Sequence, residues 1–138
     1  GTFSGIRNLR QIWRKYVRLT PSAREEEMNL NNKIFHSVLN TENGEVSEET
    51  IFKYFQDGKI IWAEYSGGSI IRGFLIGFVN ENNTLEFSYQ HINRENKIRV
   101  GECSSISKIN TQGKIVFYET WKWTNGDCSS GTSVIEEV

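Results

Sequence analysis

Residues 59–79 read KIIWAEYSGGSIIRGFLIGFV. Two apolar runs, rich in β-branched and aromatic side chains, flank the polar segment at residues 66–69. These residue types favour strands, and glycine favours the tight turn that joins two antiparallel strands. The stretch therefore predicts a β-hairpin. Side chains alternate along a strand, so Trp62 and Glu64 should leave one face of its first arm and Tyr65 the other.

The same pattern of short apolar runs and polar turns continues on both sides of the hairpin. An Asp-Gly pair at residues 57–58 and the Asn-rich segment 80–83 are typical of chain reversals. Together with the two arms of the hairpin, further strands are expected at residues 33–40, 50–55, 84–92, 97–109, 114–123 and 130–138. With no helix-length segment between them, these eight strands predict an antiparallel meander.

A meander of eight strands favours closure, because a closed sheet has no exposed edges. We therefore expect an all-β fold, a single eight-stranded antiparallel up-and-down barrel. A half-open sheet or a two-sheet sandwich is the alternative. Gly73, Gly77 and Gly101 fall inside strands, where glycine often marks a bend or a bulge.

The first 27 residues differ in charge from the remainder. They hold six Arg or Lys and three Glu, whereas the whole chain has a net charge of −1. Apolar residues from Ile6 to Leu19 fall on one side of a helical wheel, which predicts a basic amphipathic helix. We accordingly divide the chain into a leader, residues 1–27, and a barrel domain, residues 28–138.

Three interpretations of the leader remain open. It could be an artificial extension or an upstream start, with Met28 the natural first residue. It could be a helix that docks on the barrel or plugs it. Its Arg-rich composition also suits a membrane-surface, targeting or partner-binding helix.

Composition limits the classes of function. The 138 residues are 37% hydrophobic and 24% charged, as expected for one globular domain. No apolar run approaches the roughly 20 residues of a membrane span, and the mildly acidic body argues against nucleic-acid binding. Two cysteines are too few for a disulfide framework, which favours a reducing, cytoplasmic location; a single Cys103–Cys128 bridge stays open. The oligomeric state is left open.

Eight strands enclose an interior just wide enough for packed side chains or for one small ligand. A binding site there needs a few polar groups in a mostly apolar cavity. If the aromatic-rich face of each strand points inward, the candidate lining is Trp62, Glu64, Phe87, Tyr89, His91, Glu102, Glu119, Trp121 and Trp123. If it points outward, Tyr65, Arg72 and Gln90 become the polar lining instead.

Each of these residues also has a purely structural interpretation. Aromatic residues on strands most often pack in the core or across strands, and strand glutamates most often face solvent. A hydrogen-bonded structural role is the commonest one for a residue such as His91. The sequence has no nucleophile elbow, phosphate loop or dinucleotide fingerprint, so we assign no catalytic residue. The two histidines lack partners at metal-ligand spacing, and we expect no metal or cofactor.

Several strings resemble a known family. WAEYSGG at residues 62–68, YQHIN at 89–93 and WKWTNGD at 121–127 are similar to small bacterial proteins often labelled N-acetylglutamate synthase. The resemblance covers residues 28–138 and implies acetyl transfer from acetyl-CoA to glutamate. The Gln/Arg-x-x-Gly-x-Gly/Ala motif of common acetyltransferases is absent, and no catalytic residue is carried over. The fold resembles the calycins, the lipocalin and avidin group, which implies small-molecule binding.

The sequence thus predicts a cytoplasmic bacterial barrel that binds an unidentified, partly apolar small molecule in its interior. One alternative is a barrel enzyme that uses Tyr, His and Glu side chains for acid–base chemistry. Another is the acetyltransferase activity that the resemblance implies. A third is a protein-interaction module.

Overall fold

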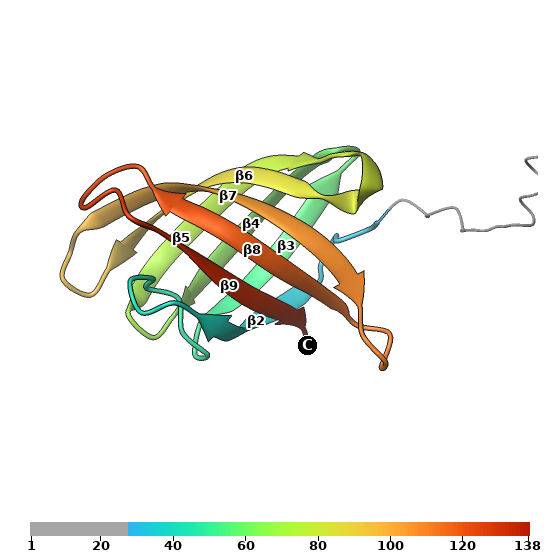
Figure 1. The fold of residues 1–138 in the computed structure, drawn as a ribbon, viewed down its shortest axis with the longest axis horizontal. Coiled ribbons are helices and arrows are strands. Elements are labelled where there is room, and N and C mark those ends of the chain that lie inside the picture. The colour runs from blue at the N-terminus through green and yellow to red at the C-terminus, as the bar shows by residue number, and fades with distance from the viewer. Residues whose placement is uncertain (1–27) are drawn as a thin grey trace, which may run out of the picture.

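Eight antiparallel strands form a closed barrel in the order in which they occur in the chain (Figure 1). This computed structural model describes residues 28–138, so the helix expected over residues 6–19 lies outside the described residues. The strands are β2 (Ile34–Asn40), β3 (Ile51–Asp57), β4 (Ile60–Gly67), β5 (Ile70–Val79), β6 (Leu85–Asn93), β7 (Ile98–Ile109), β8 (Ile115–Trp123) and β9 (Ser130–Glu137). The predicted up-and-down barrel is confirmed.

Pairing between the first and last strands closes the sheet. β2 and β9 lie side by side in Figure 1, with Phe35 opposite Glu137 and Asn40 opposite Ser133. Every described strand therefore has two neighbours, and no row of backbone groups is left at an open edge. Within residues 28–138, no helix is long and apolar enough to cross a membrane.

The predicted turns have the backbone geometry that their residues favour. Asp57 pairs with Ile60, which leaves Gly58 and Lys59 as a two-residue turn. Gly58 has a φ of +61°, a conformation that costs glycine little because it lacks a Cβ atom.

The barrel has a filled end and an end that holds the site. Leu30, which precedes β2, is fully buried at the filled end. Nearby, the Phe35 ring lies 5.1 Å from the rings of both Tyr54 and Phe117. Turns at residues 67–69 and 93–97, and the longer loop that joins β2 to β3, surround the other end. We call this end the mouth, and residues 41–50 the mouth loop.

Inside the barrel, glycine on one strand makes room for a large ring on its neighbour. Gly73 pairs with Tyr65 on one side and with His91 on the other. A Cβ atom at Gly73 would overlap the Tyr65 ring. Gly101 is placed in the same way between Tyr89 and a tryptophan of β8.

Close packing against large rings therefore explains the glycines at positions 73 and 101 better than the bends or bulges that we expected there. The breaks in register on β4 and β5 fall elsewhere, between Tyr65 and Gly67 and between Ile70 and Arg72.

Replacing Gly73 with alanine should destabilise the barrel. The added methyl group would overlap the Tyr65 ring, and overpacking of this kind costs about 1–3 kcal/mol. Urea unfolding of Gly73→Ala should show this loss, whereas Ser104→Ala on the exposed outer face should change the free energy of unfolding by less than about 0.5 kcal/mol. Equal effects of the two substitutions would contradict the packing role of Gly73.

Candidate ligand-binding site

A cavity of about 50 Å³ lies inside the barrel beneath the mouth loop. Aromatic and aliphatic side chains form most of its wall: Phe52, Leu75, Phe87, Tyr89, Trp121 and Trp123. Polar groups enter it from Glu119, Ser133 and His91. A single water needs roughly 10–15 Å³ of such space, so the cavity has room for a few water-sized groups. A mostly apolar pocket with a few polar groups is the usual form of a small-molecule site.

The alternation predicted for β6 and β8 is correct. Phe87, Tyr89 and His91 of β6 all line the cavity. So do Glu119, Trp121 and Trp123 of β8. These six candidates are therefore brought together around one space.

Three other candidates lie on the outside of the barrel, so the expectation that they line the interior is wrong. Trp62 is 37% exposed and stacks on Phe55, with 5.8 Å between ring centroids. Glu64 and Glu102 are both exposed. Each stands opposite a lysine, Lys53 and Lys122 respectively. Cross-strand pairs of opposite charge suit a solvated face, which explains why these carboxylates point outward.

On β4 and β7, where the expected inward face is wrong, smaller or less polar residues point inward. On β4, Ile61, Ala63 and Tyr65 are buried, and on β7, Gly101 and Cys103 are buried. The small residues of β7 lie opposite the large rings of β6 and β8, and such an arrangement fills a narrow interior.

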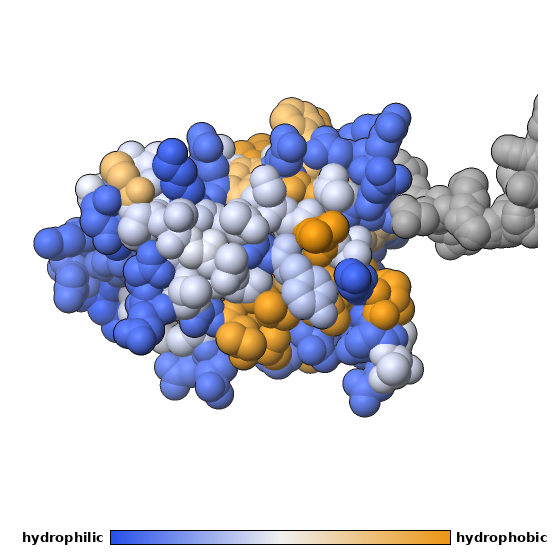
Figure 2. Space-filling view, viewed as in Figure 1, coloured by the Kyte–Doolittle hydropathy of each residue, from blue (hydrophilic) through white to orange (hydrophobic). Residues whose placement is uncertain are grey.

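The alternative polar lining is correct at one position. Tyr65 lines the cavity, whereas Arg72 and Gln90 are exposed. Apolar side chains also occur among charged ones on the outer surface, as Figure 2 shows for one face.

Glu119 supplies a carboxylate to the cavity. Its Oε1 accepts a hydrogen bond of 2.8 Å from the Ser133 hydroxyl on the neighbouring strand β9. Part of the residue remains accessible, but its carboxyl group is enclosed by protein. Burial raises the pKa of Glu119 to about 7, and the hydrogen bond from Ser133 opposes that rise. Near neutral pH, this carboxyl group can therefore both donate and accept a proton.

Two hydroxyl groups are buried near Glu119. Ser105 stands opposite Glu119 on β7, is 3% exposed and interacts with the Cys103 thiol. Tyr54 is fully buried, and burial and the nearby Glu119 carboxylate raise its pKa well above the usual value. The Tyr54 hydroxyl has no hydrogen-bond partner among the described residues, but it lies outside the residues that line the cavity.

A chain of hydrogen bonds runs from the cavity to the mouth loop. The Tyr65 hydroxyl lies 3.0 Å from His91 Nδ1, and His91 Nε2 lies 2.8 Å from Glu45 Oε1. Burial lowers the pKa of His91, although the hydrogen bond with Glu45 opposes this effect. In the neutral imidazole, Nε2–H donates to the carboxylate, and Nδ1 accepts from the tyrosine hydroxyl. Gly73 makes this contact possible, because the Tyr65 ring reaches His91 across it.

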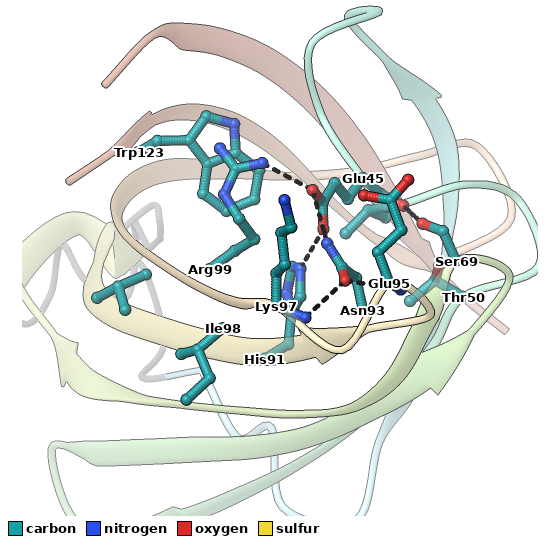
Figure 3. A network of polar contacts seen from close by, with 12 residues as sticks. Glu45, Thr50, Ser69, His91, Asn93, Glu95, Lys97, Ile98, Arg99 and Trp123 are labelled. Atoms are coloured by element: carbon teal, nitrogen blue, oxygen red, sulfur yellow. Dashed lines mark hydrogen bonds and ion pairs between the residues drawn. The ribbon is translucent and has the colours of Figure 1, made fainter. Parts of the chain in front are cut away.

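Glu45 is the centre of the polar network at the mouth (Figure 3). Arg99 Nη1 donates to Glu45 Oε2 at 2.7 Å, and Asn93 Nδ2 lies 3.3 Å from both carboxylate oxygens. The Arg99 guanidinium lies over the Trp123 ring, 3.9 Å from its centroid. Burial favours a higher pKa for Glu45, but the hydrogen bonds from His91 and Asn93 and the positive charge of Arg99 outweigh it and lower the pKa.

Several of these residues were not among the predicted site residues. Glu45 and Asn40 belong to a polar, turn-rich segment that carries no sequence signal for contact with the interior. Arg99 shares its strand face with Gly101 and Cys103, and this alternation could have identified it. Among residues 28–138, no group of three His, Cys, Asp or Glu side chains is arranged to hold a metal ion. Both cysteines are free thiols, Cys103 buried and Cys128 exposed.

Glu119→Gln should change how stability depends on pH. The native carboxyl group keeps its proton up to about pH 7, whereas an ordinary one loses it near 4.5, so the native state binds more protons between these values. The free energy of unfolding of the wild type, relative to Glu119→Gln, should therefore fall by up to about 3 kcal/mol as the pH rises from 4.5 to 7. Urea unfolding of both proteins across this range measures the difference, and contributions shared by both, such as that of His91, cancel. Parallel profiles would contradict a raised pKa.

Comparison with known proteins agrees with the fold. The family model described as Avidin-like protein matches residues 28–138. No curated protein matches the sequence at a significant level. The family match supports the calycin-type barrel and gives no support to the N-acetylglutamate synthase activity that the resemblance implies. The chain belongs to the avidin-like protein family.

Proposed function

We propose that the protein binds a small, partly apolar molecule inside the barrel, beneath the mouth loop. The observation that carries this proposal is the interior cavity, with its aromatic walls and one enclosed carboxyl group. Burying a carboxyl group costs free energy unless it is well paired, and Glu119 receives one described hydrogen bond. A barrel that served only as a rigid scaffold would be more stable with an apolar residue there. Membership of the avidin-like family agrees with ligand binding in the interior.

The polar groups around Glu119 favour a particular kind of ligand. Glu119 lines the cavity, and its ionised form accepts N–H hydrogen bonds from a ligand there. A compact amide or urea carries N–H donors and a carbonyl acceptor on one edge. We therefore infer a neutral, amide- or urea-like head group with an apolar body against the aromatic wall.

Binding explains the site better than acid–base catalysis by His91. Both ring nitrogens of His91 already have partners, Tyr65 and Glu45. A general base needs a nitrogen within reach of the proton that it removes. The chain of hydrogen bonds from Tyr65 to Glu45 therefore supports a role in holding the mouth together.

A matched pair of small molecules tests the proposal. 2-Pyrrolidinone and cyclopentanone have the same ring size, but only the former has an N–H group. We expect 2-pyrrolidinone to raise the melting temperature and to bind roughly ten- to a hundredfold more tightly than cyclopentanone, the difference that a hydrogen bond to a charged group supports. Thermal unfolding and Trp fluorescence titrations measure both, and imidazolidin-2-one and biotin extend the series to ureas.

Two variants locate the binding. Cys103→Leu enlarges a side chain that lines the cavity and should abolish the effect of 2-pyrrolidinone. Trp62→Ala removes a side chain from a groove on the outer face and should leave the effect unchanged. The reverse pattern would place the ligand outside the barrel. If neither the amide nor the ureas bind the wild type, the proposed head group is wrong.

A further inference from the structure

The mouth loop covers part of the cavity. Gly44, Glu45 and Val46 form the part of the cavity wall that belongs to this loop. Movement of this segment would widen the opening between the mouth and the cavity. What holds the segment in place therefore limits access to the cavity.

Neutral hydrogen bonds hold both sides of the loop. The Asn40 side chain donates to the carbonyl oxygen of Val46 at 2.9 Å. The Asn43 carbonyl oxygen accepts from Trp123 Nε1 at 3.0 Å, and its side-chain amide donates to the Ser130 carbonyl oxygen at 2.8 Å. Near the end of the loop, the Thr50 hydroxyl donates to the Gly67 carbonyl oxygen at 3.1 Å.

The charged contacts between the loop and the barrel are concentrated at Glu45. Within the described residues, the mouth loop forms one ion pair, between Glu45 and Arg99, and Glu45 also accepts a hydrogen bond from the neutral His91. The partners come from two strands, since His91 and Asn93 belong to β6 and Arg99 to β7 (Figure 3). Hydrogen bonds to charged groups are stronger than neutral ones, so these contacts contribute most to the closed position.

The strands hold their side of the contact rigidly. Asn93 Oδ1 accepts the backbone N–H groups of Glu95 and Lys97, each at 3.0 Å, which orients the side-chain amide toward Glu45. The Trp123 ring supports the guanidinium of Arg99. A fixed set of donors therefore faces a carboxylate on a loop. This is the arrangement of a latch, in which one side chain releases a segment.

We propose that the mouth loop is a lid over the cavity and that the contact of Glu45 with Arg99, His91 and Asn93 is the latch that keeps it closed. The proposal rests on the proposed function for its purpose, because the lid would govern ligand exchange. Its mechanical part concerns the chain alone and can be tested without a ligand.

Cys103 reports on opening of the lid. Its thiol lines the cavity and is 6% exposed, whereas Cys128 is exposed. In a Cys128→Ser background, methyl methanethiolsulfonate modifies Cys103, which borders both the cavity and a groove on the outer face, so that only a rate that depends on the latch reports on the lid. Mass spectrometry then measures the rate of modification under native conditions.

Breaking the latch should accelerate modification of Cys103. We expect Glu45→Ala to increase the rate at least about tenfold, because several charge-assisted hydrogen bonds are lost together. Arg99→Met, which keeps an apolar side chain over Trp123 but removes the charge, should also increase it. The double variant should be no faster than the faster single variant, because both substitutions remove the same contact.

Two controls separate the lid from other effects. Glu48→Ala removes an exposed carboxylate from the same loop and should leave the rate unchanged. Ile135→Val weakens the core in the part of the barrel away from the mouth and tests whether general loss of stability exposes the thiol. Equal rates for Glu45→Ala and Glu48→Ala would overturn the latch. The latch would also be overturned if Ile135→Val increased the modification rate as much as Glu45→Ala does when the two variants have equal free energies of unfolding. A third contrary result would be effects of Glu45→Ala and Arg99→Met on the rate that multiply in the double variant.

The outcomes for the lid and for ligand binding can be told apart. Faster modification of Cys103 in Glu45→Ala, with no binding of 2-pyrrolidinone or the ureas, supports the lid and contradicts the proposed head group. Binding in the cavity with no change in the modification rate contradicts the lid and leaves the binding site in place.

Discussion

Large rings facing small residues across neighbouring strands are the constraint on which the interior depends. Eight strands leave little space, so Tyr65 and Tyr89 fit only because Gly73 and Gly101 stand beside them. This complementarity sets which face of β4 and β7 turns inward. It also brings Tyr65 within 3.0 Å of His91 on a strand that does not pair with its own. The polar network at the mouth therefore depends on how the side chains pack inside the barrel.

The two ends of the barrel interior have different roles: the filled end packs side chains for stability, and the end toward the mouth holds the candidate site. At the filled end, Phe35, Tyr54 and Phe117 pack their rings together and leave little room. Toward the mouth, the enclosed carboxyl group of Glu119 and the hydroxyl group of Ser133 replace apolar contacts. Such groups reduce stability unless another molecule satisfies them. Their position beside an aromatic wall is the physical basis for proposing a ligand with hydrogen-bonding groups at its buried end.

The mouth combines a cavity with a loop whose charged contacts converge on one carboxylate. Glu45 reaches three donors on β6 and β7 at once, and the neighbouring Trp123 contacts Arg99, His91 and the loop backbone. Because these contacts are polar and close to solvent, they can break without disrupting the aromatic packing below them. A site of this kind can stay closed and still exchange a ligand.

The sequence by itself determined the strands, their turns and their antiparallel order, because alternation and turn chemistry are local properties of the chain. It also grouped the β6 and β8 residues of the cavity on one face of each strand, the more aromatic one, and left open whether that face points inward. Only the tertiary structure decided the inward face of β4 and β7, from which Trp62, Glu64 and Glu102 point away. On β7, small residues face inward because the neighbouring side chains of β6 and β8 are large. Glu45 and Arg99 meet because barrel closure brings the mouth loop over β6 and β7, and no local pattern records a contact between residues 54 positions apart.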